Sequence, residues 1–241
     1  KARIQKVLSD QGILSRRRTE ELIKEGRITV NGRPAQPGHP IDIRKDIVAI
    51  DGERIWFQKK KKNYYVMLHK PAGVLSARVD GRQQTVLDLL PQELQRQNLF
   101  PVGRLDKDTV GLLLITNDGN LAHRLLSPKH HVDKCYFAKV QGNVTKDDAE
   151  KFAEGVNIGT EDEPEITMPG KLDIIKSDDL SEIRLTIQEG KFHQVKRMFQ
   201  AVGKEVVYLK RERMGSLILD DNLVEGEYRM LTEEELKNLL F

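Results

Sequence analysis

Apolar residues near the start of the chain recur at the spacing of two short helices. Ile4, Val7 and Leu8 share one face of a helix that we expect to end near Gly12. Ser15 is a favourable N-cap for a second helix, which runs through Glu25 and stops at Gly26. The first part of the chain is therefore predicted to begin with two helices.

Short strands are predicted to follow these helices. The β-branched run 28–30 precedes Asn31-Gly32, a dipeptide typical of tight hairpins. Further strands are expected around 41–43 and 47–50, with Asp51-Gly52 as a second turn. Two helices and a few short strands thus make up a small N-terminal module.

From Asn63 onward, alternating apolar runs predict more strands than helices. The strands are expected at 64–68, 112–115, 136–140, 182–188, 205–209 and 217–219, and the helices at 85–90, 120–126, 145–155, 193–203 and 232 onward. Strands and helices do not alternate regularly, which favours an α+β fold over a doubly wound one. We expect a mainly antiparallel, mixed sheet flanked by helices.

Charge is distributed unevenly between these two parts. Residues 1–62 hold 16 Lys and Arg against 8 Asp and Glu, a net charge of +8, and the remainder carries −5. A basic module joined to a mildly acidic body indicates a polyanionic partner that is gripped mainly by the module.

Arg16, Arg17 and Arg18 occupy the first turn of the second predicted helix. Cations there oppose the helix dipole, an arrangement that costs stability unless an anion is bound. Backbone N–H groups and guanidinium groups together suit a phosphate. We therefore favour phosphate binding over an exposed basic face without a ligand.

Several functional classes are excluded by pattern. The phosphate-loop, dinucleotide-binding and zinc-protease motifs are absent, and the single Cys135 cannot form an internal disulfide. His130 and His131 are adjacent, so on an extended chain they point to opposite faces and form a poor metal site. No metal is expected. Without a long apolar run or an apolar signal segment, we expect a cytoplasmic protein without a membrane span.

The richest candidate chemistry lies in residues 103–119, GRLDKDTVGLLLITNDG. Asp106 follows Arg104 in a Gly-bounded turn at the mouth of an apolar strand, a position that suits a nucleophile or general base. Aspartates are also common in turns for purely structural reasons. Tyr136 and the pair Lys196-Arg197 are further candidates, although that pair is equally consistent with an exposed helix face.

Four stretches in order resemble the motifs of the RsuA-type pseudouridine synthase family. In chain order they are HKPAG (69–73), GRLDKDTVGLLLITNDG (103–119), SPKHHVDKCY (127–136) and EGKFHQVKRMF (189–199). In the first of them, His69 stands where the family usually has Asn. Residues 2 to about 55 resemble the RNA-binding domain named after ribosomal protein S-four. We expect that domain at 1–58, a basic linker at 59–62 and a catalytic domain at 63–241.

The resemblance implies a role for each candidate. Asp106 matches the family nucleophile and Tyr136 its active-site tyrosine. Lys196 matches a basic partner that is Arg in many relatives, and Arg197 is the reserve for that role. Arg104 matches the arginine that fills the gap left by a flipped uridine.

The resemblance also implies a substrate and partners. The family's type member modifies one uridine of 16S (small-subunit) ribosomal RNA, so we expect that activity, on an assembly intermediate, from a monomer without cofactor. A pseudouridine synthase acting on 23S ribosomal RNA is the first alternative. A catalytically inactive RNA-binding protein of ribosome assembly is the second.

Overall fold

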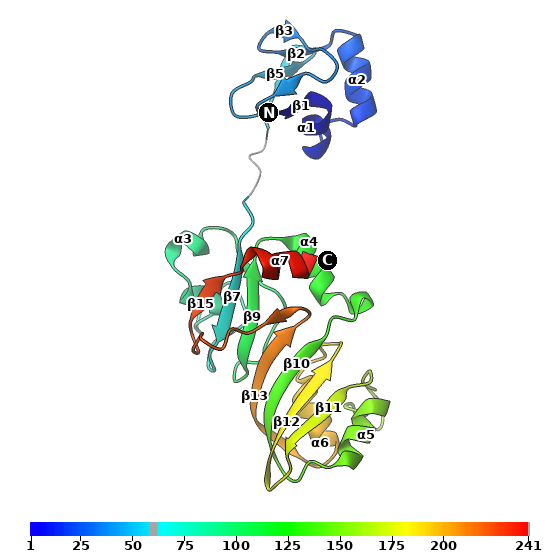
Figure 1. Ribbon diagram of the computed structural model, residues 1–241, viewed down its shortest axis with the longest axis vertical. Coiled ribbons are helices and arrows are strands. Elements are labelled where there is room, and N and C mark those ends of the chain that lie inside the picture. Colours follow the sequence, from blue (N-terminus) through cyan, green and yellow to red (C-terminus); the bar gives the residue numbers. More distant parts are fainter. Residues whose placement is uncertain (58–61, 241) are drawn as a thin grey trace. The chain divides into compact units, whose positions relative to one another are not determined.

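The computed structural model describes residues 1–57 and 62–240, and the chain divides into two compact units, Lys1–Lys62 and Asn63–Phe241 (Figure 1). Each unit is considered by itself. The basic linker expected at 59–62 lies outside the described residues except for Lys62. Across the described ranges, no helix has the length and apolar character needed to cross a membrane.

The N-terminal unit packs two helices on short strands. Its elements are β1 (Ala2–Arg3), α1 (Ile4–Asp10), α2 (Arg16–Lys24), β2 (Ile28–Val30), β3 (Arg33–Pro34), β4 (Pro40–Ile41), β5 (Val48–Ile50) and β6 (Glu53–Ile55). A four-stranded sheet has the order β3-β2-β5-β6, and β1 pairs separately with β4. The predicted strand at 41–43 is reduced to the two residues of β4.

Local chemistry in this unit follows the sequence. Ser15 Oγ accepts a hydrogen bond from the backbone N–H of Arg18 at 3.1 Å, so the predicted N-cap is confirmed. Asn31 and Gly32 have φ of 51° and 77°, the left-handed pair that a tight hairpin between β2 and β3 requires. The helices bury Ile4, Leu8 and other apolar residues against the strands.

The larger unit is built on a nine-stranded sheet. Seven strands follow the path β11-β12-β10-β13-β9-β7-β15, and off this path β8 pairs with β9 and β14 with β13. The strands of this sheet are β7 (Tyr65–Lys70), β8 (Phe100–Pro101), β9 (Val110–Thr116), β10 (Lys134–Gln141), β11 (Lys171–Lys176), β12 (Leu180–Ile187), β13 (Glu205–Met214), β14 (Leu217–Ile218) and β15 (Tyr228–Met230). β9 and β13 are parallel, and the other pairings are antiparallel. The predicted mixed, mainly antiparallel sheet is confirmed.

Helices cover the sheet at two places. The helices of this unit are α3 (Gln92–Gln95), α4 (Gly119–Leu126), α5 (Lys146–Glu154), α6 (Gln194–Ala201) and α7 (Glu233–Leu240), and its 3-10 turns are η1 (Val86–Leu89) and η2 (Pro128–His130). Figure 1 shows α5 and α6 beside β11 and β12, and α4 and α7 near β7 and β9. Phe152 and Phe199 belong to one apolar core, and Leu121 and Leu239 to a second. β9 contributes to both cores, which is why every one of its residues is buried.

The structure departs from the sequence prediction at several elements. The helix expected at 85–90 is the 3-10 turn η1, capped by Thr85 and Asp88. β13 extends to Met214 rather than ending near residue 209, because it pairs with both β10 and β9. β11 was not predicted; it is an edge strand that buries only Leu172, so it has no apolar alternation.

Candidate active site

Asp106 lies in the loop that joins β8 to β9. Its backbone carbonyl accepts a hydrogen bond from Thr109 N at 3.1 Å, which closes a turn immediately before the buried strand. The apolar run that follows is anchored between two cores, so the turn is set on a rigid strand end. The predicted placement of Asp106 at the mouth of a buried strand is confirmed.

Lys70, at the end of β7, donates hydrogen bonds to the backbone of this loop. Its ammonium group is fully buried and donates to the carbonyls of Pro71, Lys107 and Thr109 at 2.9, 3.1 and 2.8 Å. Burial lowers the Lys70 pKa to about 8, and the nearby charges of Asp108 and Asp106 oppose that shift. The lysine of the HKPAG stretch therefore positions the backbone around Asp106.

Lys196 brings a cation to Asp106 from the first turn of α6. Its Nζ lies 3.3 Å from Asp106 Oδ2 and 2.7 Å from Asp108 Oδ1. Burial opposes the charge on Lys196, but the hydrogen bond that Lys196 donates to Asp108 and the charge of Asp106 raise the Lys196 pKa overall. The hydrogen bond from Lys196 also lowers the pKa of Asp108. Lys196 is thus a charged group shared by two carboxylates.

His193 also reaches Asp106, and the sequence interpretation missed it. Its Nε2 lies 3.5 Å from Asp106 Oδ1, and its ring stacks on Phe192 with 3.8 Å between centroids. The backbone of His193 is left-handed, with φ of 47°, which aims the side chain at the loop as α6 begins. The one sequence feature that pointed to His193 was its position just before a predicted helix. Asp108 was missed as well, although it lies two residues after Asp106.

A small cavity of about 60 Å³ brings Asp106 and Tyr136 together, and Lys196 contacts Asp106 from outside its lining. Asp106, Tyr136, Arg104 and His193 are among the residues that line it. Tyr136 comes from β10 and is 8 % exposed, so its ring forms a wall. Arg104 is exposed, and no hydrogen bond or ion pair to it is found among residues 1–57 and 62–240. A carboxylate, an aromatic ring and an available guanidinium group therefore line one space, and the carboxylate also contacts the Lys196 cation.

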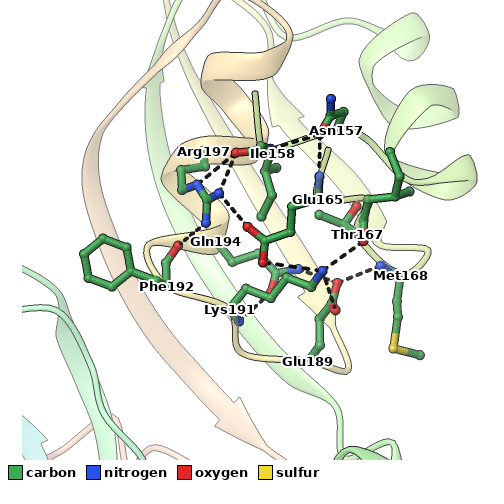
Figure 2. Close-up of polar contacts among 12 residues, drawn as sticks. Asn157, Ile158, Glu165, Thr167, Met168, Glu189, Lys191, Phe192, Gln194 and Arg197 are labelled. Atoms are coloured by element: carbon green, nitrogen blue, oxygen red, sulfur yellow. Dashed lines mark hydrogen bonds and ion pairs between the residues drawn. The ribbon is translucent and has the colours of Figure 1, made fainter. Parts of the chain in front are cut away.

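Arg197 does not serve as the reserve counter-charge. Its Nε and Nη2 donate to the carbonyl of Ile158 at 3.0 and 2.6 Å, Nη2 contacts Glu165 Oε2 at 2.6 Å, and Nη1 donates to Phe192 O at 2.9 Å (Figure 2). The guanidinium fork of Arg197 is therefore occupied by protein acceptors. Lys196 makes the contact with Asp106.

The network in Figure 2 fixes the segment that carries His193 and Lys196. Glu189 Oε1 accepts hydrogen bonds from Met168 N and Gln194 Nε2, both at 2.7 Å. Lys191 Nζ donates to Ile166 O at 2.9 Å and lies 3.6 Å from Glu165 Oε1. The entry into α6 is consequently tied to the loop that precedes β11.

The remaining sequence candidates lie elsewhere. Arg17 and Arg18 form exposed ion pairs with Glu21 on α2, and Arg16 is exposed in the N-terminal unit. His130 and His131 are exposed in and after η2. In the described part of the chain, no cluster of three or more His, Cys, Asp or Glu is arranged to hold a metal ion.

Comparison with known families identifies the class of enzyme to which this fold belongs. Residues 64–201 match the RNA pseudouridylate synthase family, and residues 2–48 match the S4 domain. The chain belongs to the RNA pseudouridine synthases.

Relatives are similar along nearly the whole chain. An uncharacterised RNA pseudouridine synthase of Bacillus subtilis is 47% identical, covering 97% of this chain and 96% of its own. The ribosomal small subunit pseudouridine synthase A of Vibrio cholerae is 41% identical, covering 98% and 99%. A crystal structure of a pseudouridylate synthase matches with a TM-score of 0.68 at 34% identity, covering 99% of this chain and all of the other.

Proposed function

We propose that this enzyme converts a uridine of 16S ribosomal RNA into pseudouridine, with Asp106 as the nucleophile. The observation that carries the proposal is the Asp106 carboxylate, which lines one cavity with Tyr136 while Lys196 Nζ lies 3.3 Å away. The small-subunit target is supported by relatives that bear that activity in their names, including the 41% identical protein of Vibrio cholerae.

The reaction exchanges one bond for another. The bond from the ribose anomeric carbon to ring nitrogen 1 breaks, the base turns, and a bond to ring carbon 5 forms. The proton on carbon 5 then leaves, and nitrogen 1 gains one. Asp106 either attacks the anomeric carbon or removes the neighbouring sugar proton, and both routes require an ionised carboxylate. The Lys196 Nζ, 3.3 Å from Asp106 Oδ2, orients the carboxylate.

Tyr136 and Arg104 handle the base. The Tyr136 ring is positioned to stack on the detached uracil, and its hydroxyl suits removal of the carbon 5 proton. A uridine must leave the RNA stack before its anomeric carbon can be reached, and the available guanidinium of Arg104 fills the vacated position. The exposed arginines of α2 bind RNA phosphates, so the affinity that they supply does not depend on the base sequence of the RNA.

Mapping of pseudouridines in ribosomal RNA tests the proposal directly. We expect a strain that lacks the gene to lose one pseudouridine from 16S RNA, and the wild-type gene to restore it. Asp106→Asn should restore nothing while binding RNA nearly as well as wild type. Loss of a 23S pseudouridine would contradict the small-subunit target, no loss would contradict the activity, and turnover by Asp106→Asn would contradict the nucleophile.

A further inference from the structure

A second cavity of about 500 Å³ lies against the one that holds Asp106. The two share Arg104, Tyr136, Gly190 and Lys191 in their linings, so the Tyr136 ring is a wall between them. Neither Asp106 nor Lys196 lines the larger cavity. The catalytic roles proposed above therefore leave this space unexplained.

Two buried cations line the larger cavity. Lys134 is 8 % exposed and Arg211 is 2 % exposed. Arg211 pairs with Tyr136 across β10 and β13, and Lys134 precedes Tyr136 by two residues on β10, so all three lie on one face of the sheet. Register thus places two positive charges directly beside the tyrosine of the proposed active site.

Protein groups compensate these charges poorly. Arg211 Nε donates to Leu112 O at 2.9 Å, but its Nη2 is buried and without a hydrogen-bond partner among the described residues. Lys134 Nζ has a long contact of 3.4 Å to Val132 O. Burial and the charge of Arg211 lower the pKa of Lys134, and the charges of Asp133 and Glu189 only partly oppose that shift. Buried cations without counter-ions destabilise a fold.

The single carboxylate in the lining does not neutralise the cavity. The lining holds one carboxylate, that of Glu189, and four cationic side chains, those of Arg104, Lys134, Lys191 and Arg211. Glu189 Oε1 is taken by two N–H donors, and Glu189 Oε2 lies 3.9 Å from Lys191 Nζ. A net positive charge therefore remains in a recess that opens beside Tyr136.

We propose that this cavity binds a backbone phosphate of the RNA strand next to the reacting uridine. Lys134 donates a hydrogen bond to the phosphate. Arg211, whose Nε donates to Leu112 O, contributes its positive charge from the cavity lining. A phosphate carries the full negative charge that the lining lacks, whereas a uracil carbonyl is neutral. The inference rests on the proposed function only in taking RNA as the ligand.

The test compares Lys134→Met with Lys139→Met. Lys139 lies on the same strand but on the opposite face, where its Nζ sits 5.8 Å from the Tyr208 ring centroid. The probe is a labelled oligouridylate, whose dissociation constant is measured at several salt concentrations. We expect Lys134→Met to weaken binding roughly tenfold and to reduce the slope of log affinity against log salt by about 0.7. Lys139→Met should change neither quantity.

Thermal unfolding in inorganic phosphate gives a second readout. Lys134→Met removes a buried charge that Arg211 repels, so we expect it to fold with unchanged or higher melting temperature in a phosphate-free buffer. Added phosphate should raise the melting temperature of wild type and Lys139→Met more than that of Lys134→Met. General stabilisation by phosphate cancels in this comparison.

Either of two results would overturn the phosphate site. An unchanged salt slope in Lys134→Met would mean that Lys134 does not contact a phosphate of the RNA. Equal phosphate stabilisation of all three proteins would mean that the cavity does not bind a phosphate ion. Pseudouridine formation by the wild-type enzyme is scored separately on 16S RNA. Formation with an unchanged slope contradicts this inference alone, and a reduced slope without formation contradicts the proposed activity alone.

Discussion

Lys196 lies closer to Asp108 than to Asp106: its Nζ is 2.7 Å from Asp108 Oδ1 and 3.3 Å from Asp106 Oδ2. The side chain of Asp108 is 73 % exposed and that of Asp106 is 25 % exposed. The outer carboxylate therefore anchors the cation, and the inner one shares its charge.

We expect Asp108→Asn to lower kcat roughly tenfold with a smaller effect on KM, because Lys196 loses the negative charge at its shortest contact and is less well placed against Asp106. Steady-state kinetics on the RNA substrate measures this. Asp147→Asn is the matched control, since Asp147 also lies 2.7 Å from a lysine, Lys151, on the distant α5. An unchanged kcat in Asp108→Asn would show that Asp106 alone positions Lys196.

Lys70→Met should reduce kcat strongly, because the carbonyls of Lys107 and Thr109 lose the donor that sets the Asp106 loop. It should also change the pH dependence of stability. The folded-state pKa of Lys70 is about 8 against a usual value of 10.5, so between these values the unfolded chain holds more protons. The free energy of unfolding of wild type should therefore rise from pH 8 to 10 relative to Lys70→Met.

Denaturant titrations at several pH values measure that difference, and titrations common to both proteins cancel. A constant difference between wild type and Lys70→Met across this range would mean that burial does not shift the Lys70 pKa. Normal kcat in the variant would show that the loop keeps its position without the lysine.

Gly111→Ala should destabilise the larger unit by about 3 kcal/mol. A Cβ at Gly111 would lie 2.3 Å from Arg211 O, and its φ of +108° is strained for any other residue. This glycine permits the parallel approach of β9 to β13. Gly119→Ala, at the start of α4 with open space around it, should change stability by less than about 1 kcal/mol. Equal effects in denaturant titrations would contradict the close approach.

Arg197→Lys should destabilise the protein by about 2 kcal/mol, because lysine cannot satisfy Ile158 O and Glu165 together. RNA affinity should change little, as expected of a structural arginine. Arg184→Lys is the control, since its pair with Glu212 is half exposed and contributes less than about 1 kcal/mol. A large loss of RNA affinity at normal stability would restore the RNA-contact hypothesis for Arg197.

Neutralising Arg16, Arg17 and Arg18 to Gln should weaken RNA binding and reduce its salt slope by about 2, near 0.7 for each lost phosphate contact. Among residues 1–57 and 62–240, the guanidinium groups of Arg17 and Arg18 pair only with the partly exposed Glu21, so stability should change by less than about 1 kcal/mol. Lys24→Gln, at the other end of α2, is the control. An unchanged slope in the triple variant would remove the case for a phosphate site there.

Local chemistry made much of the fold predictable. The cap at Ser15, the hairpin at Asn31-Gly32 and the buried alternation of Tyr136, Ala138 and Val140 depend on neighbours in sequence. β11 escaped prediction because an edge strand needs little apolar alternation, and η1 because a single capped turn does not distinguish an α-helix from a 3-10 helix.

By itself the sequence determined the two-part organisation, the class of sheet and the motifs that hold Asp106, Tyr136 and Lys196. Only the tertiary structure decided how these groups are used. In the folded chain, Lys196 contacts Asp108 as well as Asp106, and Arg197 donates to the carbonyl of Ile158. Arg211 is buried beside Tyr136. The physical reason is that caps, turns and alternation act over a few residues, whereas burial and charge pairing depend on strands that meet from distant parts of the chain.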